Sequence, residues 1–221
     1  MPDGSGNLPV IRVPSTLLHR VVRLVGALAG LATAAHAQGE GLASRSKGRP
    51  DAPVTVFEMS DFQCPYCRHF AVETLPALER DYVASGKVRF VYITYPLTHI
   101  HVNAMATAEV ALCAARQGKF WPVHDRLFER QEQWASLKAP RAYLLALADS
   151  AGANRAALAQ CLASGAGGAA VQADIAAAER AGARTTPTFY IEGGLIEGDA
   201  PVSVFREVLD SVYRSKAAPA H

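Results

Sequence analysis

The stretch PVTVFEMSDFQCPYC, residues 53–67, decides the fold. Residues 53–59 form a compact apolar run typical of a buried strand, and residues 60–63 are typical of a turn. From Pro65 to Tyr82 the apolar positions recur at spacings of three and four, which is the period of a helix. The pattern therefore predicts a strand that passes through a short turn into a helix.

A second strand is predicted at residues 88–93, VRFVYI, after Gly86 ends the helix. Pro76 inside the helix predicts a kink, because proline cannot donate the backbone hydrogen bond of a regular turn. A strand, a helix and a second strand over this length predict a right-handed unit with two parallel strands.

The remaining sequence is helical before it returns to strands. Residues from about 103 to 164 show helical periodicity with no strand among them, and residues 164–168, SGAGG, interrupt it. We expect the C-terminal part to contain, in order, a helix ended by Gly182, a strand at 188–191, a hairpin turn at Gly193-Gly194, a strand at 195–197 and a last helix around Phe205. The predicted order is βαβ, a helical block, then αββα.

The tetrapeptide Cys64-Pro65-Tyr66-Cys67 lies where the first strand gives way to the first helix. Free N–H groups and the positive dipole end at a helix N-terminus stabilise a thiolate over a thiol. Pro65 falls at the first helical position, where its missing N–H and fixed φ suit the helix. We therefore interpret Cys64 as an exposed, low-pKa nucleophile and Cys67 as the shielded thiol that resolves a mixed disulfide.

Two other interpretations of the cysteine pair stay open. A C-x-x-C can be half of a zinc site, which His69, His99 and His101 could complete, although no second C-x-x-C is present. A structural disulfide with so short a loop adds little stability and is usually reactive. The context of strand, cysteine pair and helix favours redox chemistry.

Residues 1–37 have the pattern of a secretory signal peptide. Arg20 and Arg23 precede a short apolar run that leads to an A-x-A cleavage triplet ending at Ala37. A membrane anchor is the alternative, but a spanning helix needs about 20 apolar residues. We expect cleavage after Ala37, export to the periplasm, and a flexible lead-in over residues 38–52.

Length and charge set further bounds. A chain of 221 residues that is 50% hydrophobic can bury a core without disulfides or metals, as one domain or one domain with an insertion. The chain has 22 basic and 20 acidic residues, of which residues 1–37 hold three and one, so 19 of each remain. This balance gives no electrostatic reason to expect a nucleic-acid partner.

Residues 61–68, DFQCPYCR, resemble the active site of the DsbA-like branch of the thioredoxin superfamily. The resemblance extends over most of the chain after the leader, including the helical block and residues 185–189, TTPTF, ahead of the hairpin. It implies an α/β thioredoxin fold with an inserted all-helical domain. The expected bounds are 53–97 and 167–216 for the thioredoxin domain and 98–166 for the helical one.

The resemblance also implies roles for residues around the cysteines. Pro187 is expected to follow a cis peptide bond beside them, and Thr186 to offer its backbone to an extended substrate segment by strand addition. Pro65 and Tyr66 are expected to lie against the same substrate. Glu58 matches a buried acid of thioredoxin-like proteins, which would exchange protons with Cys67 and have a raised pKa.

The other two cysteines, Cys113 and Cys161, fall on predicted helices of the inserted block. Some DsbA-like relatives have a structural disulfide within this block, so the resemblance implies that these two residues pair. Two buried free thiols are the alternative. The segments HVNA, from His101, and FWPVH, ending at His124, also have family form, and we interpret both histidines as structural.

For the direction of exchange we expect a disulfide-donating oxidase that acts on folding exported proteins. Residues 38–52 are too few for an oligomerisation module, so we expect a monomer, with a membrane partner that re-oxidises the cysteines and no cofactor or metal. A reductase or isomerase is the alternative, because Tyr66 stands where DsbA has a histidine. The Pro-Tyr pairing is that of glutaredoxins, at about −200 to −230 mV against about −120 mV for DsbA. A carrier of copper or zinc through the two thiolates is a third possibility.

Overall fold

A computed structural model of the chain describes residues 41–217. The predicted signal peptide at residues 1–37 lies outside these residues, as does the start of the lead-in. No helix among residues 41–217 combines the length and the apolar character needed to span a membrane.

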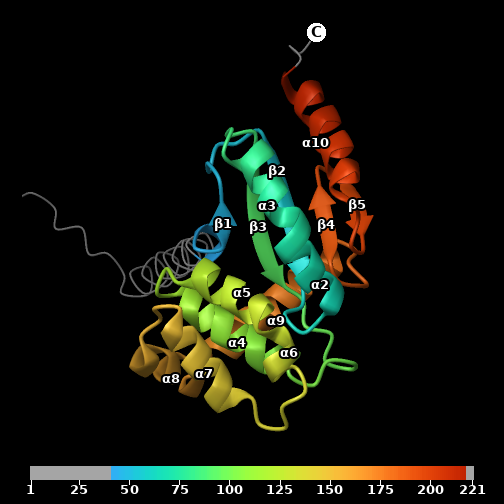
Figure 1. Cartoon of the computed structure of the whole chain (residues 1–221). Helices are drawn as coiled ribbons and strands as arrows, with labels where there is room; N and C mark the ends of the chain where they lie inside the picture. The colour runs from blue at the N-terminus through green and yellow to red at the C-terminus, as the bar shows by residue number, and fades with distance from the viewer. Residues whose placement is uncertain (1–40, 218–221) are drawn as a thin grey trace, which may run out of the picture. The chain divides into compact units, whose positions relative to one another are not determined.

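A five-stranded sheet in the order β1-β3-β2-β4-β5 forms the centre of the fold (Figure 1). The strands are β1 (Ser46–Lys47), β2 (Val54–Ser60), β3 (Val88–Thr94), β4 (Thr188–Ile191) and β5 (Gly194–Glu197). Strands β2 and β3 are parallel, and the other neighbouring pairs are antiparallel. Because β2 is central and ends at Ser60, the turn that follows it opens at an edge of the sheet between β3 and β4.

The helix after β2 is irregular. It consists in turn of α2 (Pro65–His69), a π-helical segment η1 (Phe70–Thr74), α3 (Leu75–Leu78) and a second π-helical segment η2 (Glu79–Val83). Pro76 lies in α3, between the two widened segments. Since proline has no N–H to donate to the preceding turn, the regular helical ladder cannot continue through this position.

Helices inserted between β3 and β4 gather in one block (Figure 1). They are α4 (Ala104–Ala115), α5 (Phe120–Glu129), α6 (Gln131–Trp134), α7 (Arg141–Ser150), α8 (Arg155–Ala163) and α9 (Ala166–Arg180). Their apolar side chains form a core that also includes Phe62, Cys64, Cys67 and Tyr92. The cysteine pair therefore belongs to the core that joins the helical block to the sheet.

A second core lies between the sheet and the helices α3 and α10, and it is aromatic at its centre. Phe189 of β4 lies between Phe70 and Phe205, with ring centroids 4.4 and 4.7 Å from theirs. Phe205 belongs to the last helix, α10 (Val202–Ala217), whose apolar face covers the strands. From β2 onward, the order of strands and helices is the one that the sequence predicts.

The described part of the lead-in differs from the flexible segment predicted over residues 38–52. β1 pairs with β3, and Arg45 is buried in an ion pair with Asp174 of α9. The Asp174 carboxylate also accepts hydrogen bonds from the N–H and the hydroxyl of Thr94, at 2.9 and 2.8 Å. A buried ion pair with these additional partners fixes the segment to the sheet.

Two glycine positions also differ from the sequence prediction. The hairpin turn consists of Glu192 and Gly193, both with positive φ (47° and 91°), whereas Gly194 begins β5. Gly167 lies inside α9 and not in a break between helices. A Cβ at Gly167 would come 2.9 Å from the sulfur of Cys113, so the missing side chain allows α9 to approach α4 closely.

Candidate active site

Cys64 and Cys67 lie at the start of α2, after the turn that follows β2. Cys64 is the N-cap residue, with extended backbone angles (φ −72°, ψ 125°), and Pro65 begins the helix. The carbonyl of Cys64 accepts a hydrogen bond from the N–H of Arg68, at 3.1 Å. The sequence predicts an exposed Cys64, but its residue is only 4% exposed, and Cys67 is fully buried. The exposed residues of the motif are Pro65 and Tyr66, the latter at 64%.

The two thiols differ in their preference for the proton. The hydrogen bond from the Cys67 thiol, together with the Thr186 side chain and the N–H groups of Cys67 and Tyr66, lowers the pKa of Cys64 to about 6 against the opposing effect of burial. Burial raises the pKa of Cys67 well above its usual value, and the Cys64 thiolate adds to this. The geometry therefore favours a thiolate on Cys64 and a thiol on Cys67.

A second loop, before β4, lies against the cysteines. The Thr186–Pro187 peptide bond is cis, and the Cys64 sulfur lies 3.4 Å from the Thr186 carbonyl oxygen. Both Thr186 and Pro187 are buried. The structure thus brings Cys64 and Thr186 together from segments about 120 residues apart, with the cis peptide bond before Pro187 directly after Thr186.

Glu58 of β2 is fully buried behind Cys67. Neither of its carboxyl oxygens has a hydrogen-bond partner among the described residues. Burial raises the pKa of Glu58 to about 8, with a small opposing effect of the Ser60 hydroxyl. The charge of Glu58 in turn raises the pKa of Cys67, so the two groups are electrostatically linked.

The turn between β2 and α2 is held by side chains that sequence reasoning missed. Asp61 is buried and accepts hydrogen bonds from the N–H groups of Gln63 and Leu97, at 2.8 and 2.9 Å. Its second oxygen also lies 2.7 Å from Nδ1 of His101. An aspartate whose carboxylate accepts a hydrogen bond from the N–H two residues later is a local sequence signal for a turn. The link to His101 depends on the loop after β3 and has no local signal.

The helical block also contacts this turn through an amide. Gln131 is buried, and its Nε2 donates to the carbonyls of Phe62 and Cys64, at 2.7 and 2.9 Å. The Asn103 side chain donates to three carbonyls, one at the end of α6 and two in the loop that follows it, and its N–H donates to the Gln63 side chain. Because these partners are about 30 to 70 residues apart in the chain, periodicity could not reveal them.

Two of the three histidines considered for a metal site, His69 and His101, have carboxylate partners. His69 Nδ1 lies 2.6 Å from Asp199, and His101 pairs with Asp61. Residues 41–217 contain no group of three His, Cys, Asp or Glu side chains placed to hold a metal ion. His124 is buried among aromatic rings, its Nδ1 lies 2.8 Å from Asp125, and burial lowers its pKa.

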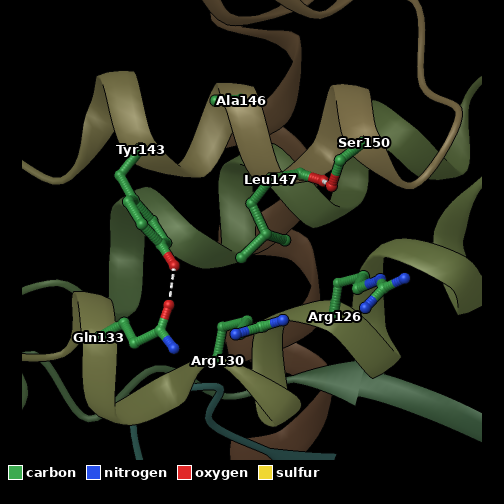
Figure 2. Close-up of a pocket in the computed structure, with 7 residues that line it drawn as sticks. All are labelled: Arg126, Arg130, Gln133, Tyr143, Ala146, Leu147 and Ser150. Carbon is green, nitrogen blue, oxygen red and sulfur yellow. Dashed lines mark hydrogen bonds between the residues drawn. The ribbon is translucent and has the colours of Figure 1, made fainter.

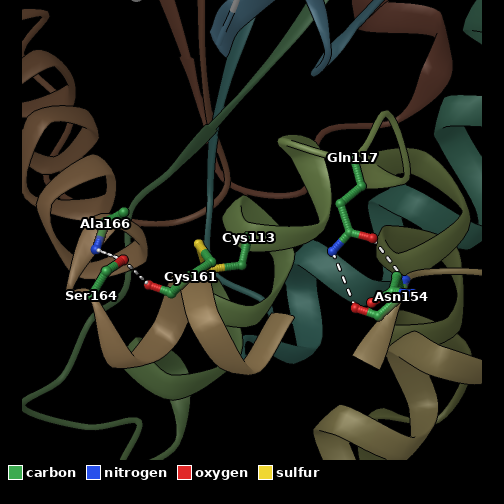
Figure 3. The surroundings of a disulfide bond; sticks show 6 residues. All are labelled: Cys113, Gln117, Asn154, Cys161, Ser164 and Ala166. Atoms are coloured by element: carbon green, nitrogen blue, oxygen red, sulfur yellow. Dashed lines mark hydrogen bonds between the residues drawn. A yellow bond between two sulfur atoms is a disulfide. The ribbon is translucent and has the colours of Figure 1, made fainter. Parts of the chain in front are cut away.

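The remaining cysteines lie within the helical block, away from the motif. Figure 3 shows the disulfide between Cys113 of α4 and Cys161 of α8. A cavity of about 250 Å³ opens elsewhere in the block, between α5 and α7, and includes Arg126, Arg130 and Tyr143 in its lining (Figure 2). The lining of this cavity includes neither Cys64 nor Cys67.

Comparisons with known proteins agree with this architecture. Residues 42–211 match the family model described as Thioredoxin. The chain is 32% identical over 169 residues to Na(+)/H(+) antiporter NhaA 3 of Salinispora tropica, covering 76% of this chain and 24% of the antiporter. It is 36% identical over 94 residues to a probable disulfide bond formation protein D of Bacillus anthracis, covering 41% of this chain and 43% of that protein. The chain therefore spans less than half the length of these curated relatives.

A solved structure shows the same fold. BdbD from Bacillus subtilis, in its oxidised form, superposes with a TM-score of 0.71 at 24% identity, covering 79% of this chain and 94% of BdbD. The prediction of a thioredoxin fold with an inserted helical segment is confirmed.

Proposed function

Because this chain belongs to the thioredoxin family, we propose that it is a DsbA-like protein thiol:disulfide oxidoreductase that reacts through Cys64 and Cys67. The observation that carries the proposal is the difference between the two thiols. The pKa of Cys64 is lowered to about 6, whereas that of Cys67 is raised well above its usual value. Disulfide exchange needs one sulfur that reacts as a stable thiolate and a shielded partner that resolves the intermediate.

In the proposed direction the chain is an oxidase. A substrate thiolate attacks the sulfur of Cys64, the Cys64–Cys67 bond breaks, and Cys67 leaves as a thiolate that takes up a proton. A second substrate thiolate then attacks the substrate sulfur of the mixed disulfide and releases Cys64 as a thiolate. The substrate loses two electrons and forms a disulfide, and the chain becomes a dithiol. The low pKa of Cys64 supports this direction, because it stabilises the reduced protein.

Substrate binding is proposed for the surface around Cys64. In this proposal the backbone of Thr186, whose carbonyl oxygen lies 3.4 Å from the Cys64 sulfur, pairs with the backbone of an extended substrate segment. The exposed Pro65 and Tyr66 would contact its side chains. A substrate that must be extended to pair in this way is an unfolded or partly folded protein.

The cellular setting is also part of the proposal. We infer export by the signal peptide at residues 1–37, a periplasmic location, a monomer, and re-oxidation by a membrane partner. The likeness to disulfide bond formation protein D supports a role in making disulfides. A periplasmic reductase or isomerase is the second candidate, and the Pro65-Tyr66 pairing favours it, since glutaredoxins with this pairing are more reducing than DsbA.

The test is the oxidation of a reduced, unfolded two-cysteine protein by stoichiometric amounts of the oxidised chain. We expect rapid formation of the substrate disulfide and loss of all activity in Cys64→Ser. Cys67→Ser, mixed with the disulfide form of the same substrate, should accumulate a mixed disulfide, because the Cys64 thiolate attacks that disulfide, releases one substrate thiol and has no partner to resolve the bond. Cys113→Ala/Cys161→Ala is the matched cysteine control and should remain active. Activity only as a reductant of an added disulfide would favour the second candidate over the oxidase.

A further inference from the structure

Orphaned polar atoms concentrate behind the cysteine pair. Six buried side-chain nitrogen or oxygen atoms have no hydrogen-bond partner among the described residues, and four belong to Glu58, Ser60 and Tyr92. A buried polar atom without a partner destabilises a fold, so such atoms are rare and require an explanation. Their concentration in one place points to a role other than stability.

The sheet places these three side chains together. Glu58 and Ser60 are two residues apart on β2 and therefore point to the same face. Tyr92 of β3 is the parallel register partner of Glu58, so its side chain lies on that face too. Glu58 and Tyr92 are fully buried, and Ser60 is 1% exposed.

Cys67 completes the cluster from the side of α2. Its sulfur lies 3.5 Å from the N–H of Asp61, which follows Ser60, and it shares a core with Tyr92. The Ser60 hydroxyl lowers the pKa of Glu58, of Cys67 and of Tyr92, although it makes no hydrogen bond with any of them in the described residues. Ser60 is thus the common neighbour of the carboxyl, the phenol and the resolving thiol.

We propose that Ser60 and Tyr92 complete, with Glu58, a buried proton-transfer site for Cys67. This inference rests on the proposed function. When the Cys64–Cys67 bond breaks, Ser60 donates its hydroxyl proton to the Cys67 thiolate and receives the proton of the Glu58 carboxyl. The Tyr92 hydroxyl then donates a hydrogen bond to the Glu58 carboxylate that remains. One proton moves from Glu58 to Cys67, and the reverse transfer accompanies formation of the disulfide. In this scheme Ser60 exchanges its proton directly with the reacting sulfur, and Tyr92 is a positioning residue.

Few other ionisable groups act on this cluster. Cys64, at the N-terminus of α2, raises the pKa of Cys67. Asp61, in the turn after β2, raises the pKa of Tyr92. From α5, His124 packs edge-on against the Tyr92 ring, at 5.1 Å between centroids, and burial lowers its pKa. Phe189, the neighbour of Glu58 on β4, is apolar. The hydroxyls of Ser60 and Tyr92 are therefore the polar groups best placed to receive the ionised Glu58.

A purely structural role predicts the opposite effect of mutation. The Tyr92 and Ser60 hydroxyls make no hydrogen bond in the described residues, so removing either one should leave the folded protein as stable as before, or more stable. Only a role in proton transfer predicts a kinetic defect in a variant of normal stability.

The experiment follows Glu58 and the exchange reaction separately. In the oxidised protein, the Glu58 carboxyl is titrated by ¹³C NMR, with its signal assigned from Glu58→Gln. We expect Tyr92→Phe to move the midpoint upward by about one pH unit, since the carboxylate loses a donor. In Ser60→Ala, we expect reduction of the disulfide by dithiothreitol to slow about tenfold or more, with an altered pH profile. Tyr82→Phe, which loses a hydrogen bond to Asp210 far from the cluster, and Ser150→Ala are the matched controls and should leave both readouts unchanged.

A Glu58 midpoint in Tyr92→Phe that equals the wild-type midpoint would overturn the inference, as would a wild-type rate and pH profile in Ser60→Ala. These outcomes differ from a failure of the proposed function. In that case the wild-type chain would not oxidise a dithiol protein, whereas the titration of Glu58 would still decide whether Tyr92 serves it.

Discussion

Cys64 and Glu58 have pKa shifts of opposite effect on stability. The lowered pKa of Cys64 favours its charged form in the folded protein, because a thiol, a side chain and two backbone N–H groups surround the sulfur. The raised pKa of Glu58 disfavours its charged form, because it is fully buried. By linkage, each shift makes the free energy of unfolding depend on pH, and the two slopes have opposite signs.

The reduced protein should gain stability relative to the oxidised protein as the pH rises from 6 to 8. An unfolded cysteine ionises at about 8.5, so the depressed pKa of Cys64 stabilises the folded dithiol above that value, and the gain is lost as the pH falls through about 6. We expect a difference on the order of 2 kcal/mol between pH 6 and pH 8 from urea unfolding of both redox forms. An equal gain in stability from pH 6 to pH 8 in the reduced wild-type protein and in Cys64→Ala would contradict the assignment.

The wild-type protein should lose stability as the pH rises, and Glu58→Gln should not. Between its usual pKa of 4.5 and the folded value of about 8, Glu58 is ionised when unfolded and protonated when folded. The unfolding free energy of the wild-type protein should therefore fall by on the order of 1 kcal/mol per pH unit in this range. We expect thermal or urea unfolding of oxidised Glu58→Gln to lack this slope, while its disulfide exchange is slower. An identical slope in both proteins would mean that Glu58 is not the buried acid.

At the scale of elements, the sequence predicts what depends on local periodicity. The strands β2, β3 and β4 lie within a residue of their predicted positions, since each is an apolar run bounded by turn residues. The positions that differ depend on contacts between distant elements. Gly167 is expected in a break between helices, but it lies in α9, where it packs closely against Cys113. Arg45 is expected in a flexible segment, but it is buried in an ion pair with Asp174. Gln131, which contacts the Cys64 carbonyl, could not be found for the same reason.

Asp174→Ala should strongly lower the free energy of unfolding of the protein. The substitution leaves the Arg45 guanidinium buried and unpaired and removes two hydrogen bonds to Thr94. Removing one partner of a buried ion pair typically costs about 3–5 kcal/mol, which urea unfolding can measure. Asp51→Ala, which breaks an exposed pair with Arg49, is the control and should have little effect. Equal stability of both variants would show that the pair does not anchor β1.

At the scale of the whole molecule, the cysteines are held between two structural units. The sheet supplies Glu58 and the Thr186–Pro187 loop, and the helical block supplies Gln131, which donates to the Cys64 carbonyl. The sequence locates the reactive pair and its neighbours through the resemblance. The equilibrium between the reduced and the oxidised cysteine pair, however, depends on all these contacts together. The direction of exchange is therefore a property of the complete fold, which the Pro65-Tyr66 pairing alone does not determine.

The reduction potential of the Cys64–Cys67 pair tests the central claim most directly. It is measured by equilibrating the protein with glutathione buffers of known ratio and quantifying the dithiol and disulfide forms. Because the low pKa of Cys64 stabilises the reduced protein, we expect a potential of about −120 to −150 mV, typical of a disulfide donor. A value below about −200 mV would contradict the oxidase and indicate a reductase or isomerase.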